Sequence, residues 1–221
     1  MALAIDSSSK GNVNPGTSIT FAHTNTGSDL VLPVGVRTET ILDLISTVAY
    51  AGVNATRIIL RANVSATESF YGYMKLAPAT GANNIVVTAA SSISMSAGAT
   101  SFTGADQTTN PENSNFVEGN PANSLNPTLT VGLANCWLWG FAGWAAGGTI
   151  TGGAGTTIRQ QDLLFGNGYG DSNGTVSTGT QGLVFDSTTT SNSTGIIFSI
   201  APVAGSAAVG TALRTLMGVG T

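Results

Sequence analysis

Between Pro78 and Thr109 the chain reads PATGANNIVVTAASSISMSAGATSFTGADQTT, and this stretch decides the fold. It contains a turn at 80–83, a strand from Asn84 to Ala89, a connection of small residues and a second strand from Ala99 to Gly104. The first strand carries β-branched residues on both parities, which is typical of a central strand packed on two faces. The stretch therefore predicts an all-β protein organised around this pair of strands.

Alternating apolar and polar residues continue this pattern on both sides of the stretch. The period of two predicts strands from Thr17 to His23, from Leu30 to Val36 and from Ser69 to Leu76. Because proline lacks a backbone donor, Pro33 favours an edge strand or a bulge in the second of these. A hairpin is expected across 48–62. Together with later segments this gives about ten short strands, the spacing of a sandwich or barrel.

Polar and glycine-rich segments separate these strands and are expected to be loops. The expected loops are Ser7 to Pro15, Asp106 to Pro127, Gly166 to Gly174 and Ser187 to Thr194. A loop as long as Asp106 to Pro127 in a compact domain usually either carries function or forms an arm that contacts a partner. We therefore predict a two-sheet antiparallel β-sandwich of jelly-roll type with long loops.

The composition sets limits on function and location. Charged residues make up only 8% of the chain, the net charge is −4, and the basic residues are scattered. Nucleic-acid binding needs a basic stripe and is not expected. No apolar run is long enough to span a membrane, and the first residues lack a signal-peptide pattern, so we expect synthesis in the cytoplasm and no membrane partner.

The length of 221 residues fits a single domain, which we assign to residues 1–203. Residues 204–221 are expected to form a C-terminal arm, because they are rich in small residues but carry Leu213, Leu216 and Met217. These three residues are predicted to contact a neighbouring subunit or a particle. Phe116 and Val117, in the middle of the expected loop after Asp106, are predicted to make similar contacts.

Four segments together resemble a known family: SITFAHTNTGSDLVLPVGV at 18–36, AYAGVNATRI at 49–58, APATGANNIVVT at 77–88 and ATSFTGADQTT at 99–109. They are similar to jelly-roll structural proteins of tailed phages, which decorate capsids or belong to tails and fibres. The resemblance implies a location on the virion surface, self-association into oligomers, and the major capsid or tail protein as a partner. It supplies no catalytic or binding residues.

The alternative is a carbohydrate-binding module, because aromatic rings stack on sugars. Trp144 lies in a glycine-rich segment and is the best candidate for an exposed contact, together with Tyr71 or Tyr73. Trp137 and Trp139 share a parity with Phe141 and are expected in the core instead.

Catalysis and metal binding have little support in the sequence. His23 is the one histidine and lies on the parity of Ile19 and Phe21, so we expect a structural role for it. Asp171 and Asn173 resemble the start of a calcium loop but lack its closing glutamate. We therefore expect a non-enzymatic protein without a cofactor. The resemblance makes a capsid decoration protein the first hypothesis, and a hydrolase with its site in the long loops is the third.

Overall fold

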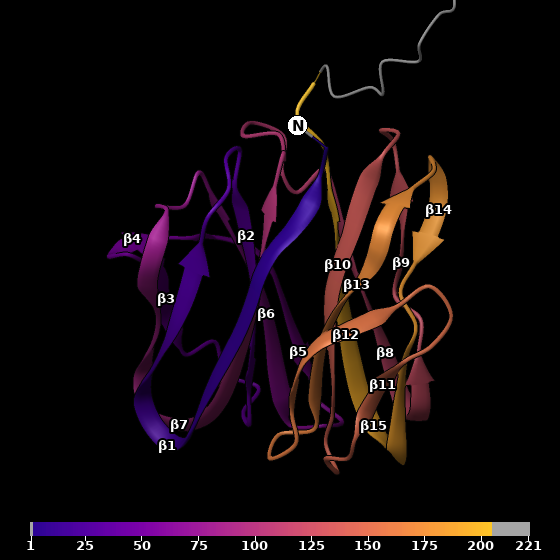
Figure 1. Cartoon of the computed structure of the whole chain (residues 1–221). Coiled ribbons are helices and arrows are strands. Elements are labelled where there is room, and N and C mark those ends of the chain that lie inside the picture. The colour runs from indigo at the N-terminus through magenta and orange to yellow at the C-terminus, as the bar shows by residue number, and fades with distance from the viewer. Residues whose placement is uncertain (1, 205–221) are drawn as a thin grey trace, which may run out of the picture.

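The computed structural model describes residues 2–204, and the regular structure in this part of the chain is β-strand (Figure 1). The expected all-β antiparallel class is confirmed, although the strands are longer and more numerous than the sequence indicated. The strands are β1 (Ala4–Asn25), β2 (Val31–Thr38), β3 (Ile45–Tyr50), β4 (Val53–Asn54), β5 (Thr56–Asn63), β6 (Glu68–Leu76), β7 (Gly81–Thr103), β8 (Asn113–Leu125), β9 (Thr128–Val131), β10 (Cys136–Trp144), β11 (Ile150–Gly152), β12 (Thr157–Asp162), β13 (Asn167–Val176), β14 (Gly179–Gly182) and β15 (Phe185–Ile200).

The N-terminal half, β1 to β7, is a sandwich built around one long bent ribbon. β1 and β7 pair antiparallel along their lengths, and their register shifts on both sides of Gly16, next to Pro15. On one side of this bend the ribbon continues into β2, β6 and β5; on the other side it continues into β3 and β4. The two layers therefore have the orders β1-β7-β2-β6-β5 and β1-β7-β3-β4.

The C-terminal half, β8 to β15, repeats this arrangement. β8 and β15 form the long ribbon, and their register shifts near Ser191, opposite the segment that contains Pro121. One part of the ribbon continues into β10, β13 and β12, and the other part pairs with β11. The short pair β9 and β14 lies over this half as an addition. The inner layer thus has the order β8-β15-β10-β13-β12, which matches the N-terminal order strand for strand.

The hairpins of the inner layers show the same correspondence in detail. Asn63 pairs with Glu68 across residues 64–67, and Asp162 pairs with Asn167 across residues 163–166, so the two hairpins have equal length. Phe70 and Tyr169 then occupy matching positions. Both lie in the core between the halves.

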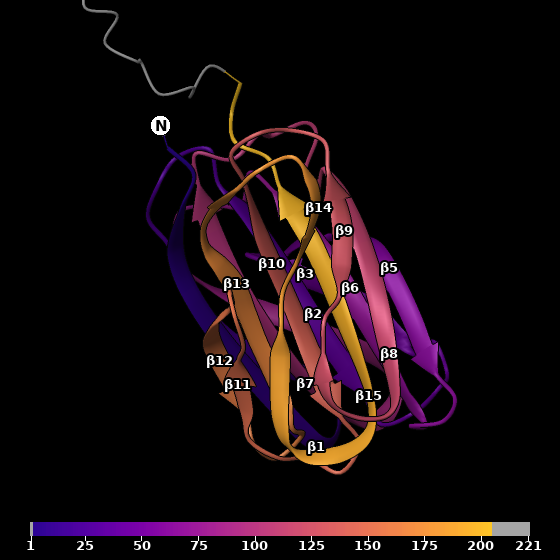
Figure 2. The same ribbon diagram turned by 90° about the vertical axis from the view of Figure 1, so that its right-hand side faces the viewer.

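The two inner layers pack face to face, as Figures 1 and 2 show. β1 contacts β12, β7 contacts β13, β2 contacts β10, β6 contacts β15, and β5 contacts β8. Exchanging each strand for its counterpart leaves these five contacts unchanged, as in a two-fold interface, and β7 in addition contacts β12. The described chain is therefore a pseudo-dimer of two related halves, a repeat that the sequence did not reveal.

Three apolar cores result, one inside each half and one between them. The N-terminal core contains Val34, Val36, Tyr71 and Tyr73, and the C-terminal core contains Trp144 with residues of β9 to β15. The core between the halves is rich in aromatic side chains: Phe70, Phe102, Trp139, Phe141, Tyr169 and Phe198.

A row of glycines makes close packing between the halves possible. Gly98, Gly35 and Gly72 lie side by side on β7, β2 and β6. An added Cβ would come within 2.6 Å of the Tyr169 ring at Gly98, 2.5 Å of the Phe141 ring at Gly35 and 2.3 Å of Phe198 at Gly72. The glycines thus form a groove that receives aromatic side chains from the C-terminal half.

Several expected loops are strands. Ser7 to Pro15 lies within β1, Gly166 to Gly174 lies largely within β13, and Ser187 to Thr194 lies within β15. Each contains hydroxyl or glycine residues without apolar alternation, and each is held by pairing to a neighbouring strand. The expected loop from Asp106 to Pro127 contains β8, so only its first part is a connection between the halves.

Two expectations about pairing and one about burial are also wrong. β2 is a central strand, and Pro33 lies where its pairing with β7 is interrupted. The segment 56–62 pairs with β6 and not with 48–50. The strand from Asn84 to Ala89 is central, as expected, but Ile85 and Val87 are buried while Val86 and Thr88 are only partly buried, so it is packed on one face.

Candidate functional site

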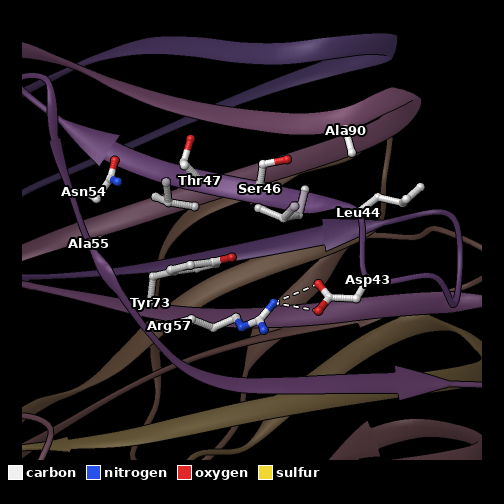
Figure 3. Close-up of a pocket in the computed structure, with 11 residues that line it drawn as sticks. Asp43, Leu44, Ser46, Thr47, Asn54, Ala55, Arg57, Tyr73 and Ala90 are labelled. Atoms are coloured by element: carbon white, nitrogen blue, oxygen red, sulfur yellow. Dashed lines mark hydrogen bonds and ion pairs between the residues drawn. The ribbon is translucent and has the colours of Figure 1, made fainter.

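The N-terminal sandwich is open between β3 and β5, and a cavity of about 360 Å³ occupies this seam (Figure 3). Six consecutive residues, 43–48, line one side. Asn54, Ala55 and Arg57 line the other, and Tyr73 of β6 lies beneath. The volume is in the range of ligand sites, and the lining mixes main-chain, hydroxyl, amide and charged groups.

An ion pair spans one end of the seam. Arg57 Nη1 donates to both carboxylate oxygens of Asp43, at 2.8 and 2.9 Å. Figure 3 shows the two side chains directed at each other from β5 and from the loop before β3. The contact with Asp43 raises the pKa of Arg57. Both side chains are a little over 40% exposed, so the pair is accessible to a ligand or to another chain.

Two buried tyrosines hold this region in place. The Tyr71 hydroxyl donates to Leu42 O at 3.0 Å and accepts from Leu44 N at 3.3 Å, which fixes the loop before β3. Burial raises the pKa of Tyr73 to about 12, so its phenol stays protonated beneath the seam. These residues position the seam from the core.

The corresponding seam of the C-terminal half is closed. β11 and β12 are in direct contact, and Gln161 Nε2 donates to Ile150 O at 2.5 Å. The N-terminal half differs because β4 follows β3, and Ala55 N donates to Val48 O at 2.7 Å before β5 begins. This extra strand holds the start of β5 away from the free part of β3.

A buried charged cluster joins the halves at the end of the molecule where both ribbons bend. Arg37, at the end of β2, donates to Glu68 in its own half and to Asn167 Oδ1 at 3.0 Å in the other half. Burial raises the pKa of Glu68, and the charge of Arg37 offsets part of that rise. Arg37 and Glu68 are 2% and 4% exposed, so the charges depend on each other.

His23 lies in a network of serines, as expected for a structural histidine. Its Nδ1 is 2.7 Å from Ser9 Oγ, and its Nε2 is 3.1 Å from Ser101 Oγ, which donates to Asp6. The side chain is 2% exposed, and desolvation lowers its pKa. The network ties the two parts of β1 to β7.

The residues predicted to contact a partner fall into two groups. Phe116 and Val117 lie on β8: Arg61 sits 4.7 Å from the centre of the Phe116 ring, and Val117 packs against the C-terminal core. They therefore contact the chain itself, although Phe116 remains 36% exposed. Leu213, Leu216 and Met217 lie outside the described residues.

The aromatic residues of the glycan alternative are buried, so the expectation of exposed contacts is wrong. Trp144 and Tyr71 are 0% exposed and Tyr73 is 4% exposed. Trp144 is the last residue of β10 and donates through Nε1 to Ala122 O at 2.8 Å. The glycine-rich neighbourhood suggested a surface loop, whereas the ring fills the C-terminal core.

Asp171, considered for calcium, serves a local contact, and so does Asp106 at the start of the connection between the halves. Asp171 accepts from Arg159 Nε at 2.6 Å, and Asp106 accepts from the main chain and hydroxyl of Thr108, which lowers its pKa to about 2. Among the described residues no group of three or more His, Cys, Asp or Glu side chains is arranged around a metal position. Residues 2–204 also contain no helix long and apolar enough to cross a membrane.

Sequence reasoning missed the seam residues Asp43, Ser46, Asn54 and Arg57. They come from separate segments, and β4 was read as part of a turn between two paired strands. No protein-family model matches the chain, and no curated protein is significantly similar to it.

Proposed function

We propose that the chain is a non-enzymatic structural protein of a phage particle, most directly a capsid decoration protein that self-associates on the virion surface. The observation that carries the proposal is the order of the strands in each half. If the two parts of each ribbon are counted separately and the two-residue strand β4 is left out, one layer of the N-terminal half runs first, last, third, sixth and fifth, and the other runs second, seventh and fourth. The order supports the proposal because it matches a jelly roll, a fold used by viral capsid proteins, except that the fifth strand pairs with the sixth and not with the fourth.

The packing supports a rigid particle component. Two sandwich halves share a buried aromatic core, and their connection is short, so the molecule presents its outer layers as fixed surfaces. Low charge lets many copies pack closely without strong repulsion. The C-terminal segment, with Leu213, Leu216 and Met217, supplies the arm for contacts with a neighbouring copy or with the capsid or tail protein.

The glycan-binding alternative has less support. Lectins also use jelly rolls, but the platform proposed for this chain consisted of Trp144, Tyr71 and Tyr73, which are buried. The alternative would need these rings at the surface.

Mass spectrometry of purified virions from the phage that encodes the chain tests the proposal. We expect many copies per particle and oligomers of the isolated protein in light scattering. Particles without the chain, or a monomer that is retained on polysaccharide columns and does not bind particles, would overturn the proposal.

A further inference from the structure

The open seam exposes strand edges that the rest of the fold leaves unpaired. β5 pairs with β6 on one side only, and within residues 2–204 β3 uses its second edge only near its end, with β4 and Ala55. Ser46 has no partner in the β3–β7 register, which shifts between Ile45 and Thr47. Exposed edges of this kind are templates for an added strand.

Apolar side chains stand at both ends of the seam. Ile41 and Leu42, in the loop before β3, are 43% and 59% exposed, and Val53 of β4 is 54% exposed. Similar exposure occurs elsewhere, as at Val64 and Leu163, but here the apolar side chains flank unpaired strand edges. The seam therefore combines main-chain edges in its middle with apolar contacts at its ends.

The part of the chain that follows Ala204 has the matching chemistry. Residues 205–221 read GSAAVGTALRTLMGVGT, with apolar side chains at several positions and Arg214 as the one charged side chain. The loop at the seam carries Glu39 and Asp43 against Arg57, so the charges are complementary. Extended, a segment of this length reaches about 55 Å, enough to cross from one copy to another.

We propose that the open seam of the N-terminal half receives residues 205–221 of a second copy as an added strand. Main-chain hydrogen bonds to the edge of β3 provide affinity, and the apolar ends of the seam take the leucine and methionine side chains. The C-terminal half has no such site, because β11 and β12 close its seam. This inference rests on the proposed self-association and names the surface that performs it.

Disulfide trapping between two singly substituted proteins tests the proposal. The native Cys136 is fully buried and gives a quiet background. A Ser46→Cys protein is mixed with a Leu216→Cys protein under mild oxidation, so that any mixed dimer must join two copies. The matched control replaces Ser46→Cys with Thr151→Cys, an exposed position on β11 beside the closed seam.

We expect the Ser46→Cys mixture to give at least about ten times more mixed dimer than the Thr151→Cys mixture, and excess synthetic peptide 205–221 to suppress it. Equal yields, no dimer, or no effect of the peptide would overturn the proposal. The assay contains no particles. Virions that lack the chain would therefore overturn the proposed function without touching this result, and failed trapping of a protein found on virions would overturn the seam alone.

Discussion

The two halves of the molecule share one strand order but differ at the inner face and at the seam. On the inner face, the N-terminal half has the glycine row Gly98, Gly35 and Gly72, whereas the matching positions of the C-terminal half include Trp139 and Phe198. At the seam, the N-terminal half is open and the C-terminal half is closed. Related folds have thus been made complementary.

This difference explains why the halves belong in one chain. Two glycine faces would leave a cavity between them, and two aromatic faces would collide, because interiors pack at nearly crystalline density. A glycine groove on one half against aromatic side chains on the other fills the space between them without a cavity or a clash. The seam of the N-terminal half has no structural role, because the inner side of each core is already covered by the other half.

The largest expected effect comes from the charged cluster at the junction. Glu68 and Asn167 are equivalent, but only Glu68 balances the buried charge of Arg37. Glu68→Ala should lower the free energy of unfolding by about 3–5 kcal/mol, because it leaves that charge unpaired. Asn167→Ala removes a neutral partner and should cost about 1.5–3 kcal/mol. Urea unfolding at pH 7 measures both; equal losses would show that charge does not distinguish the halves here.

The glycine groove gives the next effect. Gly35→Ala places a Cβ against the Phe141 ring and should cost about 1–3 kcal/mol through overpacking. Gly174→Ala is the control, because a Cβ there has no atom within 4 Å. Thermal unfolding compares the two. If Gly35→Ala leaves the Tm unchanged, the Phe141 ring can move to make room, and the halves fit less tightly than the structure indicates.

The fold class followed from the sequence, because alternation marks strands that bury one face. Thr17 to His23 and Ser69 to Leu76 were recognised in this way. The hydroxyl-rich strands were missed, since residues such as Ser7, Ser8 and Ser9 are held by main-chain pairing and carry no apolar pattern. Glycine has the same effect in β13, where Gly168 and Gly170 pack closely against β11 and β12 and look like a loop in sequence.

The repeat and the seam were beyond sequence reasoning for a different reason. Equivalent positions differ in kind: Gly35 corresponds to Trp139, and Arg37 to Phe141. Complementary packing needs different residues at these matching positions, so the repeated strand order leaves no repeat in the sequence. The seam depends on which strand pairs with β5, and a local pattern carries no such information.

Acid should affect the halves unequally, because the one histidine lies in the N-terminal half. Burial lowers the pKa of His23 in the folded chain, so the unfolded chain takes up a proton first as the pH falls. The contribution of the neutral His23 to folding stability is fully present above about pH 6.5, the pKa of a histidine in the unfolded chain, and is lost as the pH falls below that value. We expect the Tm to fall between pH 7 and 5.5 by less than Gly35→Ala lowers it, and His23→Gln to flatten this dependence.

Hydrogen exchange locates this effect. Protection should fall first in β1 and β7, which the histidine network joins, while β10 and β15 keep theirs. Loss of protection in both halves together would show that they unfold as one unit at low pH. The halves would then differ in their packing but not in their response to acid.

The smallest expected effect distinguishes two arginines of β5, one at the seam and one at the interface between the halves. Arg57 and Arg61 lie on β5 with similar exposure, 42% and 40%. Arg57 pairs with Asp43 at the seam, whereas Arg61 binds Glu118 and the Phe116 ring of the other half. Arg61→Ala should cost about 1 kcal/mol, since it removes an ion pair and a cation–π contact, and Arg57→Ala only about 0.2–0.5 kcal/mol. A larger loss for Arg57→Ala in urea unfolding would make the ion pair a structural clasp of the N-terminal sandwich and remove the reason for treating the seam as a surface free to bind.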